Sequence, residues 1–159
     1  MSGIIGGSPN MRSGVVGQVS GGSKLVWSGW NSTSSAVEGS WDPWPLDAET
    51  TAVNTDYMTK STGTFTCVRA GTYQMSFITM MSANNSYYTH HNMTDSNGSI
   101  QTHDYIFNDS ANWVHQGYTW IRNLSVSNTI LFKTFMQDGD YAWHGGTSYS
   151  QLAITYLNP

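Results

Sequence analysis

The chain has 159 residues and a formal net charge of −4, and charged residues make up only 10% of it. Its six Lys and Arg residues are spread singly and form no basic patch for phosphate contacts. No apolar run approaches the roughly 18 residues that span a bilayer. We therefore expect neither nucleic acid nor a membrane as a partner. Strong helix formers are scarce, and no window has a helical apolar period, so an all-β fold is favoured.

The first 23 residues are too rich in glycine and serine to build a core of their own. Ordering glycine costs entropy, and the few β-branched residues supply little apolar surface to offset that cost. A short motif occurs twice, as Ser2, Gly3, Ile4, Ile5 and Gly6, and in degenerate form as Ser13, Gly14, Val15, Val16 and Gly17. We predict an extended anchoring arm over residues 1–23 and one globular head over residues 24–159.

The head begins with an apolar run that predicts a strand over Lys24–Trp30. Residues 31–50 follow as a predicted long loop, because Pro43 and Pro45 remove backbone donors and argue against a central strand. Loops of this length are usually functional or interface-forming. We expect the loop to carry contacts.

The remainder of the chain alternates short apolar-polar runs with turn residues. This pattern predicts a β-sandwich with strands at 64–68, 72–80, 86–93, 100–107, 113–124, 129–137 and 148–157. Cys67 is the sole cysteine, so no intrachain disulfide is expected, and we interpret it as a small buried hydrophobe. The candidate core or trimer-interface residues are Phe65, Tyr73, Met75, Phe77, Trp120, Leu152, Ile154 and Tyr156.

Two strand patterns resemble a known superfamily. The spacing Phe65-x-Cys67-x-x-x-Gly71-x-Tyr73-x-x-x-Phe77 is similar to the early strand signature of the tumour necrosis factor and complement-type globular heads. The run from Ser148 to Leu157 resembles the closing strand of the same superfamily. The resemblance implies a tumour necrosis factor-like jelly-roll β-sandwich that assembles as a homotrimer.

The seven tryptophans are more than one sandwich core of this size needs. Three interpretations remain open: packing between subunits of a trimer, stacking on a glycan, and simple filling of the core. The candidate distal contact residues are Trp41, Trp44, Trp143 and His144.

The start of the arm, Ser-Gly-Ile-Ile-Gly, resembles the leader of many small structural proteins of tailed bacteriophages. With no export signal in view, this resemblance implies a virion protein made in the cytoplasm of a bacterial host. We interpret the chain as a trimeric capsid decoration or cement protein whose arm docks on the major capsid protein or another virion protein. The alternative is a tail-fibre or head-fibre tip that binds a host surface glycan.

Catalytic and metal-binding readings find little support in the residues. His90 and His91 are adjacent, so on a strand they face opposite sides and cannot readily ligate one metal. The pair His103 and Asp104 lacks a nucleophile elbow, and the carboxylates around Gly139 lack the rest of a calcium loop. We therefore expect no enzyme activity, no metal and no cofactor.

Overall fold

The computed structural model describes residues 22–34, 41–83, 87–95, 98–106, 112–136, 144–146 and 149–158. The ten motif residues of the predicted arm lie outside these ranges, and so does Trp143. The first strand begins at Lys24, the residue at which the globular head is predicted to start. The described residues contain no helix long and apolar enough to cross a membrane.

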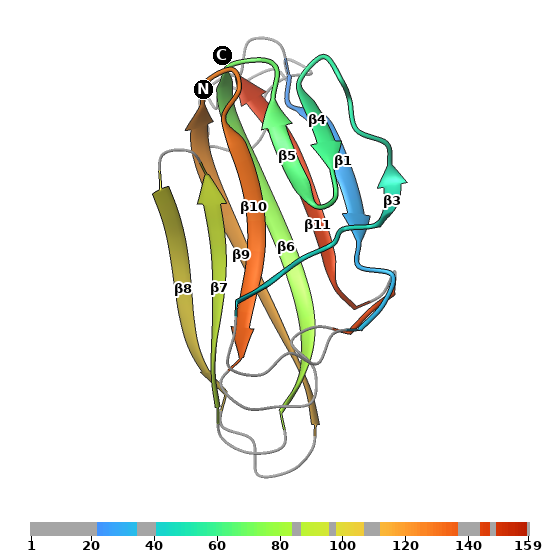
Figure 1. The fold of residues 1–159 in the computed structure, drawn as a ribbon, viewed down its shortest axis with the longest axis vertical. Coiled ribbons are helices and arrows are strands. Elements are labelled where there is room, and N and C mark those ends of the chain that lie inside the picture. Colours follow the sequence, from blue (N-terminus) through green and yellow to red (C-terminus); the bar gives the residue numbers. More distant parts are fainter. Residues whose placement is uncertain are drawn as a thin grey trace, which may run out of the picture.

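The described strands form two antiparallel sheets that face each other as a sandwich (Figure 1). The five-stranded sheet has the order β3-β1-β11-β6-β9, and the six-stranded sheet has the order β4-β5-β10-β7-β8, with β2 also paired to β10. The strands are β1 (Lys24–Trp30), β2 (Trp41–Pro43), β3 (Ala48–Thr51), β4 (Met58–Ser61), β5 (Thr64–Cys67), β6 (Gly71–Ala83), β7 (Tyr87–Asp95), β8 (Gly98–Ile106), β9 (Asn112–Leu124), β10 (Thr129–Met136) and β11 (Gln151–Asn158).

The strands predicted from residue 64 onward are all present, with shifted ends, and β1 has the predicted bounds. The prediction that residues 31–50 are one long loop is wrong, because β2 and β3 lie inside this range. Pro43 is tolerated in β2 because this strand is only three residues long and pairs with β10 alone. The sequence pattern also missed β4, a four-residue strand with little alternation.

The core fills the space between the two sheets. Its aromatic rings pack closely: the Trp27 and Phe65 centroids are 5.0 Å apart, and Phe77 stacks on Trp120 at 4.9 Å. All eight candidate core or interface residues belong to this core, and none is more than 6% exposed. Their side chains are therefore enclosed within one protomer, and a surface for a second copy has to be formed by other residues.

The segment after β2 fixes one sheet to the other. The prediction that Trp44 is a distal contact residue is wrong, because its side chain is buried and its Nε1 donates a hydrogen bond to Oγ1 of Thr134 at 2.7 Å. Two residues later, the amide of Leu46 donates to Oδ1 of Asn31 at 2.8 Å. Gly63 passes so close to the Trp44 carbonyl that no Cβ would fit there. This crossing segment is thus held by both layers.

Cys67 lies in the core at 1% exposure and is not in a disulfide, which confirms its interpretation as a small buried hydrophobe. Its Sγ donates to the carbonyl of Arg69 at 3.1 Å. The adjacent turn is joined to the β9–β10 turn by backbone hydrogen bonds between Cys67 and the residues Ser127 and Asn128.

Candidate functional site

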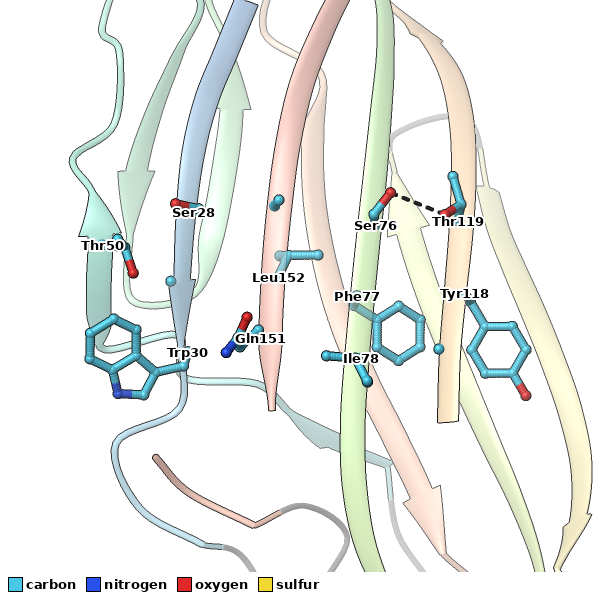
Figure 2. A pocket seen from close by; sticks show the side chains of 13 residues that line it. Ser28, Trp30, Thr50, Ser76, Phe77, Ile78, Tyr118, Thr119, Gln151 and Leu152 are labelled. Carbon is cyan, nitrogen blue, oxygen red and sulfur yellow. Dashed lines mark hydrogen bonds between the residues drawn. The ribbon is translucent and has the colours of Figure 1, made fainter. Parts of the chain in front are cut away.

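The outer face of the five-stranded sheet is built from the residues that alternate with the core. Its central row runs across four strands as Ser28, Ala153, Ser76 and Thr119, which are register partners in turn. These side chains are all small, and Oγ of Ser76 lies 3.0 Å from Oγ1 of Thr119 in a hydrogen bond (Figure 2). The middle of this face is therefore low and polar without being charged.

The two neighbouring rows add large apolar side chains. One row contains Leu25, Thr155, Gln74 and Ile121, and the other contains Trp30, Gln151, Ile78 and Gly117. Leu25 is 47% exposed, Ile78 43% and Ile121 58%, values that are high for aliphatic residues. Three of the large exposed hydrophobic residues in the described chain thus share one sheet face, which we call the uncharged face.

A hollow of about 620 Å³ lies on the uncharged face. Figure 2 shows Trp30 at the β1 side of the hollow, Ile78 on β6, and the amide of Gln151 between them. The hollow exists because Gly117 and Ala153 present almost no side chain there. A Cβ added to Gly117 would lie 3.3 Å from the carbonyl oxygen of Phe77, so even alanine would be tightly packed at this position.

The electrostatics of the uncharged face are simple, because none of the twelve positions in its three rows is charged. Polar side chains hydrogen-bond one another: Nε2 of Gln74 donates to Oγ of Ser76 at 3.1 Å. Among the residues that line the hollow there is no carboxylate, imidazole, amine or thiol. The face offers dispersion contacts and neutral hydrogen bonds, which suit docking and supply no acid or base for a reaction.

Titratable groups with shifted pKa values lie in other parts of the fold. Burial raises the pKa of the Cys67 thiol, and burial together with the neighbouring Cys67 raises the pKa of the Tyr73 phenol. Burial pushes the pKa of Asp47 up, but hydrogen bonds from Ser32 outweigh it and the pKa is lowered. Each group has a structural partner, and none lines the hollow. No cluster of three or more metal-ligating side chains occurs in the described ranges.

The remaining distal contact candidates have different surroundings. Trp41 lies on β2, is 37% exposed and packs against Phe135. His144 is half-buried, and its ring centroid lies 4.1 Å from that of Tyr149. Among the described members of this set, Trp41 is the exposed tryptophan, and it lies on the outer face of the six-stranded sheet.

Sequence reasoning missed the uncharged face. The alternation within a strand predicts which residues face the core, but it says little about what the residues in between do on the outer face. The signal was present in the outward positions of β6 and β11, such as Gln74, Ser76, Ala153 and Thr155, where solvent-facing strands usually carry some charge.

No protein-family model and no curated protein matches the sequence. Solved structures do match the fold. The chain is similar to the globular domain of zebrafish complement 1qA protein, with a TM-score of 0.58, 15% identity, and coverage of 84% of this chain and 97% of that one. It is also similar to murine APRIL at pH 8.0, with a TM-score of 0.60, 7% identity, and coverage of 84% and 98%.

The chain is an all-β jelly-roll sandwich. Both matches extend over nearly the whole of the compared domains, so they cover the two-sheet arrangement and not an isolated motif. The tumour necrosis factor-like fold class predicted from the two strand patterns is confirmed. At 7% to 15% identity the likeness concerns the fold.

Proposed function

We propose that this protein is a structural head that associates with copies of itself, as a homotrimer, through the uncharged face. One observation carries the proposal: Leu25, Ile78 and Ile121 are exposed on the same face as an open hollow, and no charge lies among them. Large apolar side chains exposed together on one sheet face, with neutral polar side chains between them, are typical of a contact site. The core of a protein interface is depleted in charge in the same way.

The hollow gives the association a specific geometry. Side chains of a second copy that entered the hollow above Gln151 would contact the Trp30 ring on one side and Ile78 on the other (Figure 2). The neutral side chains between them, such as Gln151, can donate and accept hydrogen bonds at the same time. An interface without ion pairs is screened little by salt, so we expect the assembly to persist at high ionic strength.

The further assignment is to a virion. We propose that the trimer decorates or cements the capsid of a tailed bacteriophage, with residues 1–23 docking on the major capsid protein or a neighbouring virion protein. The support is the repeated arm motif, its resemblance to phage structural proteins, and the low charge of a surface suited to many modest hydrogen bonds. Three arms on one trimer raise avidity well above that of a single arm.

Deletion of residues 1–20 tests the anchoring part of the proposal. The truncated protein should remain a soluble, folded trimer and should no longer sediment with purified particles, because its anchor is gone. The full-length chain serves as the positive control in the same gradient. Continued sedimentation of the truncated protein with particles would contradict anchoring by the arm.

A second function, carbohydrate recognition by a head fibre or tail fibre, is supported by one specific observation. Trp41 stays exposed although Trp44, three residues later, is buried. An exposed tryptophan on a fixed backbone is a suitable surface for a sugar ring, and the next section argues this site.

A further inference from the structure

Trp41 and Phe135 form an exposed aromatic pair on the outer face of the six-stranded sheet. The two residues are register partners on β2 and β10, and their ring centroids lie 5.7 Å apart with the planes inclined at 50°. Trp41 is 37% exposed and Phe135 is partly exposed. The pair therefore presents aromatic surface to solvent and does not belong to the core.

The backbone beneath Trp41 is held in place by the crossing segment. Trp44 is buried against Phe77, with ring centroids 5.3 Å apart at 88°, and its amide donates to the carbonyl of Phe132 at 2.9 Å. Together with the bond from the Trp44 indole to Thr134, these contacts fix the chain three residues from Trp41. A ligand that stacks on Trp41 would thus lose little free energy to ordering the site.

The register extends this pair into a row across four strands. Phe135 on β10 is paired with His90 on β7, and His90 is paired with His103 on β8. We call the exposed rings of Trp41 and Phe135 the aromatic row, and the backbone positions of His90 and His103 continue its line across β7 and β8. Figure 1 shows β10, β7 and β8 as neighbours, and the chain after β2 leaves β10 to reach β3. An extended ligand stacked on the two rings could follow this line of backbone positions across the strands.

The described part of the outer face around the aromatic row is mostly polar and contains one cation. Lys133 is two residues before Phe135, on the same face, and Pro43 is its register partner. Farther along β10 and on the adjoining β5 and β4, the outward positions hold Leu131 and a group of hydroxyl side chains, namely Thr59, Ser61, Thr64, Thr66 and Thr129. None of these described outward side chains is a carboxylate. The surface combines aromatic rings with hydroxyl and ammonium donors.

We propose that the aromatic row is a carbohydrate-binding site. A pyranose ring has an apolar face of C–H groups that packs on an aromatic ring, and an edge of hydroxyl groups that hydrogen-bonds to side chains such as Thr and Lys. A nucleic acid needs several cations along its backbone, and this surface has one described lysine. A protein partner would require about 800 Å² of complementary surface from each side, which two rings do not supply.

The site deepens the second proposed function and does not depend on self-association. The uncharged face and the aromatic row lie on the outer sides of opposite sheets of the sandwich. A trimer formed through the five-stranded sheet would therefore leave the six-stranded sheet turned outward. The two proposals are tested separately. Molar mass in solution tests self-association through the uncharged face, and saccharide binding tests the aromatic row.

The test uses the full-length protein on a glycan array of neutral oligosaccharides and oligosaccharides bearing sialic or uronic acids, followed by titration of the best-bound oligosaccharide in solution. We expect saturable binding, weakened about tenfold or more by Trp41→Ala, which corresponds to about 1.4 kcal/mol. Trp41→Tyr should retain binding within about threefold, because an aromatic face remains. If Trp41→Ala does not fold, Trp41→Leu is measured in its place, because leucine also removes the aromatic face.

Tyr149→Ala is the matched control, because Tyr149 has the same 37% exposure and lies outside the aromatic row. It should bind the oligosaccharide as the wild type does, and all folded variants should keep the wild-type mass in solution. Three results would overturn the proposal: no oligosaccharide is bound, Trp41→Ala and Trp41→Leu bind normally, or Tyr149→Ala weakens binding equally. Loss of particle attachment by Trp41→Ala without any saccharide binding would assign the row to a protein partner and overturn it as well.

Discussion

The rings of Tyr73 and Tyr156 pack edge to face in the core, with centroids 5.2 Å apart, but their hydroxyl groups differ. The Tyr73 hydroxyl donates to the carbonyl of Arg69 and also lies 3.3 Å from the carbonyl of Tyr57. The Tyr156 hydroxyl is buried and has no hydrogen-bond partner in the described part of the chain. The two tyrosines are neighbours in the core, but within the described residues only the Tyr73 hydroxyl is hydrogen-bonded.

The first prediction compares the removal of these two hydroxyl groups. Tyr73→Phe removes the phenol hydrogen bond to the Arg69 carbonyl and leaves that carbonyl only the weak thiol donor of Cys67, so it should lower the free energy of unfolding by about 0.5–1.5 kcal/mol. Tyr156→Phe removes an unsatisfied buried group and should change stability by less than about 0.5 kcal/mol or raise it. Urea unfolding of both variants measures the difference. An equal loss in the two variants would mean that the Tyr156 hydroxyl has a partner.

The second prediction concerns the bond from the Trp44 indole to Thr134. Thr134→Val keeps the shape of the side chain but leaves a buried indole N–H without this acceptor, so we expect a loss of about 1–3 kcal/mol. Thr59→Val on the exposed side of β4 is the control and should stay within about 0.5 kcal/mol of wild type. The measurement is chemical denaturation followed by tryptophan fluorescence. If Thr134→Val is as stable as Thr59→Val, the crossing segment is not fixed by this bond.

The third prediction compares two glycines that share a left-handed backbone. Gly63 has φ of +75° and Gly22 has φ of +68°, so alanine is strained by about 1–2 kcal/mol at either position. Only at Gly63 would the new Cβ also collide with the Trp44 carbonyl, whereas at Gly22 no atom of the described residues lies within 4 Å of it. Gly63→Ala should therefore lower the melting temperature clearly more than Gly22→Ala. Equal melting temperatures would show that the chain near Trp44 moves aside easily.

The fourth prediction is the pH dependence of stability. Burial raises the pKa of the Cys67 thiol in the native state, so above the ordinary thiol pKa of about 8.5 the unfolded chain loses its proton first. The unfolded state then binds fewer protons than the native state, and stability falls as the pH rises. The free energy of unfolding should drop as the pH rises above about 8.5, and drop less in Cys67→Ala. A Cys67→Ala variant with the full wild-type drop would remove Cys67 as the cause.

The strand pattern predicted the fold wherever alternation extended over several residues. Tyr73, Met75 and Phe77 could be assigned to the core because a strand places every second residue on one side. β2 and β4 were not predicted, since strands of three and four residues show too little alternation to be recognised. Their formation depends on neighbours distant in sequence, such as β10 beside β2.

The surfaces were less accessible to sequence reasoning than the core. Nothing local distinguishes Trp41 from Trp44, since both lie in one proline-containing segment. Their opposite burial follows from Thr134, ninety residues from Trp44 in the sequence, which accepts the bond from the Trp44 indole. In the same way, Leu25 and Ile121 come from opposite parts of the chain and share a row only through the register of β11 and β6.

The central claim is that the uncharged face joins copies of this chain. The most direct measurement is the molar mass in solution by light scattering, for the wild type and for Ile121→Lys and Val126→Lys. Both positions are 58% exposed, but only Ile121 lies on the uncharged face, since Val126 is in the turn after β9. We predict a trimer for the wild type and for Val126→Lys, and monomers for Ile121→Lys, because a buried unpaired ammonium is costly. A monomeric wild type, or an Ile121→Lys variant that stays trimeric, would contradict the account.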